Sequence, residues 1–249
     1  MRRIAIVVLG LSLCGIVPAV AQQSGANWSY EGKAGPLNWG RLDPAYKACS
    51  EGKEQSPIDI RGAHLNKNLQ PIEFHYISSS MKLVNTGHWI QVTPGPGSYI
   101  VANGTRYDLV QFHFHHPGEE AVKGKLPDMT LDLVHKSAEG KIAVIAVRLN
   151  EGNANAVLAA LWEHLPKTVG ATDTMTESMS PAGLLPSDRG YWTYEGSLTA
   201  PPCTEGVRWF IFEQEVELSR SQLRSYAALF KVTSRMIQPT HGRKIEASE

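Results

Sequence analysis

The stretch Gln111-Phe112-His113-Phe114-His115 alternates strictly between aromatic and polar residues. Successive side chains of a β-strand point to opposite faces. The stretch therefore predicts a strand with His113 and His115 on one face and the two phenylalanines on the other. Two imidazoles on one face can bind one metal ion. The interleaved aromatic residues favour a buried site, and a mere pair of surface histidines is the alternative that this motif alone leaves open.

Around this strand the sequence predicts further short strands bounded by Gly and Pro, and two late helices. The expected strands are 72–76, 99–102, 130–135, 142–149 and 207–216. The expected helices are 154–163, from its apolar spacing, and 219–230, which Ser219 caps with Gln222 three residues on. Residues 26–52 are rich in Gly, Pro and Trp and show no helical period.

No regular alternation of strands and helices appears, and no linker divides the chain. We therefore expect an α+β fold: a single domain on a large, mainly antiparallel β-sheet with a few peripheral helices. The functional site is expected in a cleft of that sheet.

The composition supports a globular protein. The 249 residues include 24 Lys plus Arg against 24 Asp plus Glu, and 42% of them are hydrophobic. Such neutrality argues against a nucleic-acid-binding protein and against a polybasic membrane-surface protein. We expect no nucleic-acid partner, and the oligomeric state is left open, with a dimer as one option.

The first residues have the pattern of a secretory signal peptide. Arg2 and Arg3 precede an apolar run at 4–17, and Ala19-Val20-Ala21 forms a small-x-small cleavage site. We expect residues 1–21 to be removed, residues 22–249 to form the mature domain, and the protein to be periplasmic or secreted. A buried core helix is the alternative. A lipoprotein box at Cys14 is a poor match because Leu13 precedes it. No other run is long and apolar enough to span a membrane.

Loss of the signal peptide leaves two of the three cysteines, Cys49 and Cys203. One pair in an oxidising compartment has a single possible connectivity. Two free buried thiols are the alternative.

Three further motifs accompany the histidine strand: Gln55-Ser-Pro-Ile-Asp-Ile60, Leu133-Val-His135 and Tyr191-Trp-Thr-Tyr-Glu-Gly-Ser-Leu-Thr-Ala-Pro-Pro202. Together, and in this order, they resemble the α-carbonic anhydrase family of the exported bacterial type, from about Trp28 to the end of the chain. The resemblance implies a zinc (Zn²⁺) cofactor and the reversible hydration of carbon dioxide to bicarbonate and a proton. Carbon dioxide and bicarbonate are then the expected small-molecule partners.

The resemblance also implies roles for individual residues. His113 and His115 match two zinc ligands, and Gln111 matches the residue that orients the first of them by hydrogen bonding. Thr199 matches the hydroxyl that accepts a hydrogen bond from the hydroxide nucleophile. Glu119 matches the carboxylate that orients this hydroxyl.

His88, in Asn85-Thr-Gly-His88, matches the proton carrier, a role that suits imidazole because its unperturbed pKa is near neutrality. Cys49 and Cys203 match the family disulfide, and 56–57 and 201–202 match its cis peptide bonds. The apolar wall beside which carbon dioxide sits is matched by Val134, Val144, Leu198, Val207 and Trp209.

Each of these residues also has an ordinary structural interpretation as a core, turn or surface residue. Glu120 is interpreted as a solvated turn charge. The remaining histidines are interpreted as structural: His64, His75, His116, His135, His164 and His241. His135 is three residues from position 132, so on a strand it should face the other way.

One departure from the family is central. The third histidine ligand is replaced here by Asp132, and the glutamate that often stands two residues earlier is replaced by Thr130. An Asp oxygen lies two bonds beyond Cβ, as does the histidine Nδ1, and carboxylate oxygen is an accepted zinc ligand. Asp has no N–H to donate, whereas Thr has a hydroxyl that can donate to it.

We therefore expect His113, His115 and Asp132 to form the metal site, with Thr130 beside it and with reduced or alkaline-shifted activity. The alternative is a non-catalytic carbonic anhydrase-like binding protein with an impaired or empty metal site.

Overall fold

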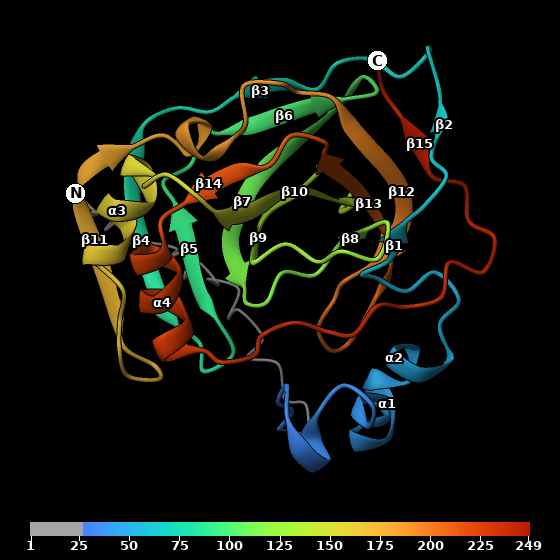
Figure 1. Cartoon of the computed structure of the whole chain (residues 1–249), viewed down its shortest axis with the longest axis horizontal. Coiled ribbons are helices and arrows are strands. Elements are labelled where there is room, and N and C mark those ends of the chain that lie inside the picture. Colours follow the sequence, from blue (N-terminus) through green and yellow to red (C-terminus); the bar gives the residue numbers. More distant parts are fainter. Residues whose placement is uncertain (1–26) are drawn as a thin grey trace, which may run out of the picture.

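A curved sheet of thirteen strands organises residues 27–249, the part of the chain that this computed structural model describes (Figure 1). Its main path runs β11-β4-β5-β7-β9-β10-β13-β12-β15-β2, with β3, β6 and β14 attached at the sides. Most pairs are antiparallel, and β10 with β13 and β14, and β15 with β2, are parallel. The predicted fold class is confirmed. The predicted signal peptide lies outside the described residues.

The strands of this sheet are β2 (His64–Leu65), β3 (Glu73–His75), β4 (Ser79–Asn85), β5 (Ile90–Pro94), β6 (Tyr99–Ala102), β7 (Thr105–His115), β9 (Met129–Lys136), β10 (Ile142–Glu151), β11 (Thr172–Met179), β12 (Tyr191–Ser197), β13 (Glu205–Phe212), β14 (Val216–Leu218) and β15 (Glu246–Ala247). A separate parallel pair is formed by β1 (Asp59–Ile60) and β8 (Ala121–Val122).

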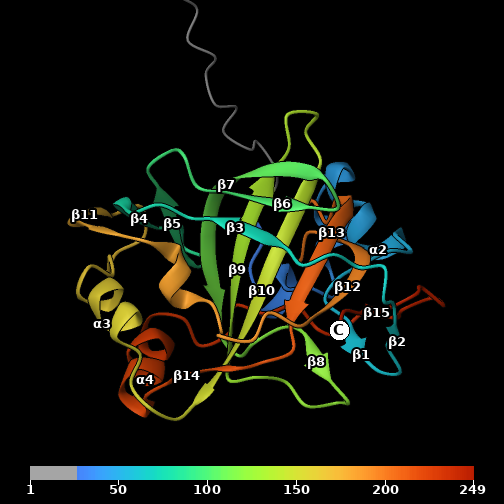
Figure 2. The same cartoon turned by 90° about the horizontal axis from the view of Figure 1, so that it is seen from above.

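Two helices of more than one turn pack beside β4, β5 and β11, where Figure 2 shows them together. They are α3 (Ala156–Glu163) and α4 (Arg220–Leu229). The Asn155 side chain caps α3, and Ser219 and Gln222 form the predicted capping box of α4. None of the helices among residues 27–249 is long and apolar enough to cross a membrane.

Two predicted elements were wrong in detail. The strand expected at 207–216 ends at Phe212, and the chain resumes pairing at β14, next to the end of β10. The lead-in at 26–52 was expected to lack helices. It contains two single helical turns, α1 (Trp39–Leu42) and α2 (Ala48–Glu51), which are too short to produce a helical period. Three 3₁₀ turns complete the fold: Gly32–Ala34, Pro44–Tyr46 and Pro181–Leu184.

A β-bulge at Val110 decides which way the histidines of β7 face. Before the bulge, the odd-numbered Tyr107 and Leu109 point into the large core, and after it Phe112 and Phe114 do so. A bulge inserts one residue and so reverses the alternation along the strand. His113 and His115 are thereby turned to the opposite face of the sheet.

The central strands are buried on both faces. The larger core lies on the side of α3 and α4, where Phe114 packs edge-on against Trp162 and the Tyr226 hydroxyl donates to the Phe114 carbonyl at 2.7 Å. A smaller apolar cluster on the other face includes Val144, Val207 and Trp209. The histidines of β7 face this second side, in a buried environment.

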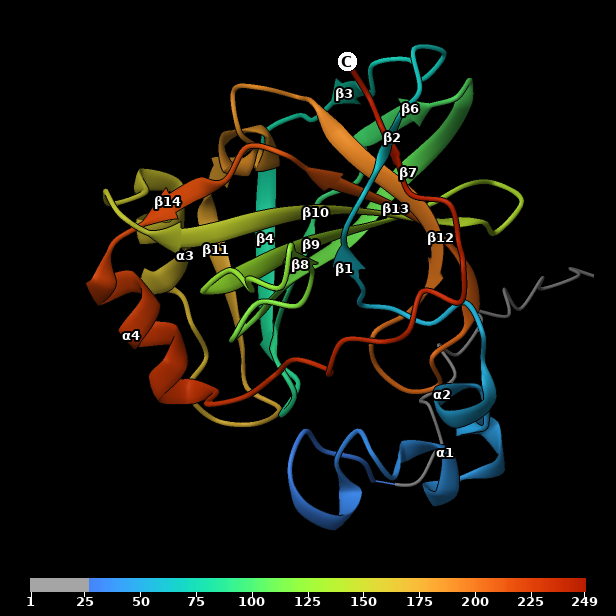
Figure 3. The ribbon, with the colours of Figure 1, turned by 45° about the vertical axis from the view of Figure 1, so that its right-hand side comes forward.

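The lead-in is tied to the loop between β12 and β13 by the disulfide Cys49–Cys203, which confirms the predicted pair. In Figure 3, α1 and α2 lie at the end of the molecule away from α4. Arg235 reinforces the junction, because its guanidinium donates to the carbonyls of Cys49 and Ser56 and to the Gln55 side chain, each at 2.8 Å. The Thr199 loop is therefore anchored next to the sheet.

Candidate metal centre

Strands β7 and β9 bring the three expected ligands together. Their antiparallel register pairs His113 with Asp132 and His115 with Thr130. One ligand atom from each of His113, His115 and Asp132 lies within 4.8 Å of the others, and all three side chains are buried. The His115 Nε2 and an Asp132 carboxylate oxygen are 3.4 Å apart.

Both imidazoles are held through Nδ1. The Gln111 Oε1 lies 3.0 Å from His113 Nδ1. The His115 Nδ1 lies 2.5 Å from the Thr233 carbonyl oxygen. A carbonyl oxygen can only accept, so this Nδ1 carries the proton and Nε2 is free to bind a metal. Thr233 was not predicted, because a main-chain carbonyl leaves no signature in the sequence.

Asp132 is held by fewer hydrogen bonds than the two histidines. Its Oδ1 is buried and has no hydrogen-bond partner among the described residues, and the same holds for His115 Nε2. The Thr130 hydroxyl, expected to donate to Asp132, instead accepts from the Glu119 N–H at 3.0 Å. The carboxylate therefore has an unsatisfied oxygen, which in a buried position is costly unless a cation binds it.

Burial and charge set the protonation of the two histidines without a bound metal. Burial lowers the pKa of His113 well below its usual range, so this ring is neutral. Burial alone would also lower the pKa of His115, but the carboxylates of Glu119 and Asp132 outweigh it and raise this pKa to about 9. The site thus favours positive charge at the point where a cation would bind.

Thr199 and Glu119 lie beside this group, as the sequence predicted. Burial raises the pKa of the Glu119 carboxyl, whereas His115 and the Thr199 hydroxyl act to lower it. The Arg235 N–H donates to Glu119 Oε1 at 2.8 Å. Arg235 was not predicted as part of the site, because its contribution comes from the backbone of a long irregular C-terminal segment.

A cavity of about 270 Å³ opens onto the metal centre. Four of the five residues expected in the apolar wall line it: Val134, Val144, Leu198 and Trp209. The fifth, Val207, is buried behind them in the same apolar cluster. Gln111 and Thr199 also line the cavity, so polar and apolar groups converge on one small space.

Comparison with known proteins agrees with this arrangement. Residues 34–249 match the family described as eukaryotic-type carbonic anhydrase. The chain belongs to the α-carbonic anhydrase family. A carbonic anhydrase of Pectobacterium carotovorum is 36% identical over 240 residues, which cover 96% of this chain and 97% of the relative. One of Klebsiella pneumoniae is 40% identical over 223 residues, with coverage of 88% and 90%.

The same family emerges from solved structures. The α-carbonic anhydrase from Thermovibrio ammonificans, solved with the inhibitor sulfanilamide, superposes with a TM-score of 0.87 at 40% identity. It matches over 90% of this chain and 100% of its own length. The enzyme class of the chain is thus carbonic anhydrase.

Glu120 corrects a sequence-based interpretation. It was expected to be a solvated turn charge, but it is fully buried, and neither carboxylate oxygen has a hydrogen-bond partner among the described residues. Burial raises the pKa of Glu120 well above its usual range, and the charges of Asp132 and Glu119 raise it further. The carbonic anhydrase site therefore has three interior carboxyl groups, of which the sequence suggested only two.

His135 lies on the opposite side of β9 from Asp132, as predicted. Its Nε2 is 2.8 Å from the Tyr76 hydroxyl, in the larger core. His88, the expected proton carrier, lines a different cavity from the metal ligands, one of about 440 Å³. Its ring stacks on Trp28 at a centroid distance of 3.7 Å.

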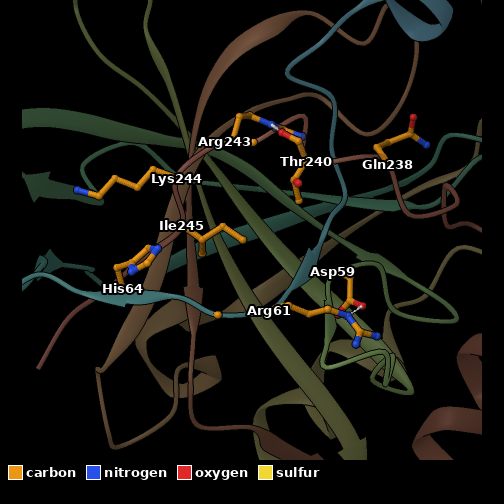
Figure 4. Close-up of a pocket in the computed structure, with 10 residues that line it drawn as sticks. Asp59, Arg61, His64, Gln238, Thr240, Arg243, Lys244 and Ile245 are labelled. Carbon is orange, nitrogen blue, oxygen red and sulfur yellow. Dashed lines mark hydrogen bonds and ion pairs between the residues drawn. The ribbon is translucent and has the colours of Figure 1, made fainter.

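A third cavity, of about 460 Å³, lies near β1 and β2 and contains several basic side chains (Figure 4). The arginines and the lysine are already paired within the described residues. Arg61 binds Asp59, Lys244 binds Glu246, and Arg243 donates to four main-chain carbonyls. Among the described residues that line this cavity, the two arginines and the lysine are therefore all engaged with other groups of the chain.

Proposed function

We propose that this protein is a zinc-dependent carbonic anhydrase that hydrates carbon dioxide reversibly to bicarbonate and a proton, with His113, His115 and Asp132 as its metal ligands. One observation carries the proposal: three buried donors converge within 4.8 Å, and two of their atoms, His115 Nε2 and Asp132 Oδ1, have no hydrogen-bond partner among the described residues. Two imidazoles and a carboxylate are a donor set that zinc accepts. The residues present therefore fit the ion.

Zinc held by His113, His115 and Asp132 would supply Lewis acidity, which would lower the pKa of water at the site and so provide a hydroxide nucleophile. The chain supplies the rest. The Arg235 N–H stabilises the ionised form of Glu119, and this carboxylate accepts a hydrogen bond from the Thr199 hydroxyl. The lone pairs of Thr199 are then left to accept a hydrogen bond from the nucleophile, which fixes its direction of attack.

The apolar wall supplies the substrate site. Carbon dioxide has no net charge and no dipole, so the apolar side chains of Val134, Val144 and Leu198 suit it. Bicarbonate is charged, and its release into water is favoured by the same apolar surface. The proton formed must also leave the site. The sequence predicts His88 as its carrier, but this ring lines a different cavity from His113 and Asp132.

Asp132 distinguishes this proposed site from one with three neutral histidines. A carboxylate reduces the local charge of the zinc centre from about +2 to about +1, so the centre acidifies water less. We propose that activity is reduced at neutral pH and recovers in alkali.

We also propose that the protein is exported and that its signal peptide is cut after Ala21. The Cys49–Cys203 disulfide supports this, because such bonds persist in oxidising compartments. Mass spectrometry of protein secreted from a bacterial host should find Gln22 as the first residue. A mature chain that retains the apolar run 4–17 would contradict the proposal.

The test of function is zinc content together with carbon dioxide hydration, measured on the mature protein from neutral to alkaline pH. We expect about one zinc per chain, loss of activity with a strong chelator, and recovery when zinc is added back. If the protein holds no zinc under saturating conditions and hydrates nothing at any pH, the non-catalytic binding protein is the correct alternative.

A further inference from the structure

Trp89 and His88 are consecutive residues, yet their side chains lie in different cavities. Trp89 lines the metal cavity, together with His113, Asp132 and Thr199. His88 lines the neighbouring cavity, where Trp28 contacts it. The indole of Trp89 thus lies on the metal side of the turn, and the imidazole of His88 lies on the other.

The turn that carries the pair is held by several hydrogen bonds. The Thr86 hydroxyl accepts from the N–H of His88 at 3.2 Å and of Trp89 at 3.1 Å. The Asn85 side chain accepts from Gly87 N–H at 2.9 Å, and Gly87 has a positive φ of 86°. These hydrogen bonds fix the backbone of the turn. A simple shift of the turn therefore does not bring His88 into the metal cavity in place of Trp89.

Trp89 packs directly on the metal ligands. Its ring stacks on that of His113 with centroids 4.8 Å apart and an interplanar angle of 27°, and it lies 6.0 Å from the ring of His115. His113 is therefore held by the indole on its face and by Gln111 at Nδ1. The indole occupies the space on the side of His113 toward the turn.

His88 is held away from the metal centre by two contacts with Trp28. The rings are nearly parallel, at 11°. The His88 Nε2 lies 2.9 Å from the Trp28 carbonyl oxygen. A carbonyl only accepts, so this nitrogen carries a proton that is already engaged.

We propose that Trp89 is a positioning residue that separates His88 from the metal site, so that the proton produced by hydration passes from the metal cavity to a base in solution instead of to His88. This inference rests on the proposed carbonic anhydrase activity. In this reaction, water and carbon dioxide give bicarbonate and one proton, and a dissolved buffer base takes up the proton.

The test is a double-mutant cycle of Trp89→Ala and His88→Ala, with zinc content verified for every variant. The hydration rate at saturating carbon dioxide is measured as the concentration of a small imidazole buffer is varied. In the Trp89→Ala background, we expect a rate component that does not depend on buffer. His88→Ala should lower this component by about tenfold, at the lower side of what general acid–base groups contribute.

The same His88→Ala change should have a much smaller effect when Trp89 is present. Trp89→Phe, which keeps an aromatic ring against His113, should restore most of the buffer dependence that Trp89→Ala removes. Equal effects of His88→Ala in both backgrounds would overturn the proposal.

A second measurement does not depend on turnover. NMR on protein with labelled histidines should show contacts between the His88 ring and the Trp28 indole in the zinc-loaded protein, and these should weaken in Trp89→Ala. Contacts from His88 to Leu198 or Thr199 with Trp89 intact would overturn the proposal even if no variant is active. An inactive zinc-loaded wild-type protein would instead show that the proposed function is wrong.

Discussion

The two strands that form the proposed metal centre hold their candidate ligands differently. On β7, each histidine has its Nδ1 hydrogen-bonded, His113 to Gln111 and His115 to the Thr233 carbonyl. On β9, Asp132 has an oxygen without a partner among the described residues, and Thr130 is engaged with the backbone of Glu119. One half of the site is oriented before a metal arrives, and the other half contributes charge without orientation.

The comparison shows what each strand contributes. Orientation through a second hydrogen bond keeps a ligand in place at no electrostatic cost. The buried carboxylate of Asp132 attracts a cation strongly. When no cation is bound, this carboxylate repels the nearby carboxyls of Glu119 and Glu120. The β7 residues thus determine the orientation of the ligands. The β9 carboxylate determines how much the free energy of the folded protein improves when a cation binds.

The largest expected effect comes from removing a ligand on either strand. His115→Ala and Asp132→Asn should each lower zinc affinity by more than about 100-fold, beyond the range known for residues that only support a ligand. Affinity is measured by competition with a chromophoric chelator. Asp108→Asn, an exposed carboxylate on β7, is the control and should bind zinc normally. Normal zinc binding by Asp132→Asn would remove β9 from the metal site.

The next effect is a shift in pH dependence. Asp132→His, combined with Thr130→Glu to accept the new imidazole N–H, restores a centre of three neutral ligands. The midpoint of the activity-pH profile should then move toward neutrality, within the interval between about 7, the general value for carbonic anhydrase zinc, and about 9, that of aqueous zinc. Hydration assayed across pH is the measurement. An unchanged midpoint with unchanged zinc content would show that Asp132 is not a ligand.

A smaller effect should follow from loosening the oriented half. Gln111→Ala leaves all three ligands but removes the acceptor for His113, so zinc affinity should fall by about 10–100-fold. Gln111→Glu retains an acceptor and should recover most of this loss. Zinc dissociation rates for the two variants give the comparison. Similar losses for both variants would mean that Gln111 acts through packing.

The sequence predicted the parts of this molecule that depend on local pattern. The alternation of aromatic and polar residues predicted the strand of His113 and His115, and the capping box predicted the start of α4. It did not show the bulge at Val110, which involves pairing with another strand. Nor did it indicate that Val216–Leu218 pairs separately with the end of β10.

For the candidate site, the family motif indicated several of the side chains that the fold brings together, among them His113, His115 and Thr199. It failed where a role depends on the backbone or on burial. Thr233 and Arg235 act through main-chain atoms, whose contacts do not depend on side-chain type. Trp89 is only partly buried, and its place beside His113 comes from tertiary packing. Glu120 is in the interior for a similar reason, because Gly118-Glu119-Glu120 looks like a surface turn until the fold encloses it.

The smallest effect concerns Glu120, which adds to the negative charge on the β9 side. Its pKa in the folded protein is raised, first by burial and then by Asp132 and Glu119, from an ordinary value of 4.5. A raised acid pKa means that the native state binds its proton more tightly than the unfolded chain does. Below about pH 4.5 the ionisation of Glu120 therefore takes nothing from the free energy of unfolding. This free energy declines as pH rises toward the folded-state pKa.

Glu120→Gln removes that decline, since an amide carries no charge at any of these pH values. In zinc-free protein the variant should melt above the wild type at neutral and alkaline pH, by about 2–4 °C for each kcal/mol relieved. The difference should shrink toward zero as pH falls to about 4.5, where the wild-type carboxyl is protonated in both states. Scanning calorimetry across this range is the measurement, with Glu31→Gln, an exposed glutamate, as the control. A difference that stays constant with pH would mean that packing at position 120, and not the repulsion among the three carboxyls, limits stability on the β9 side.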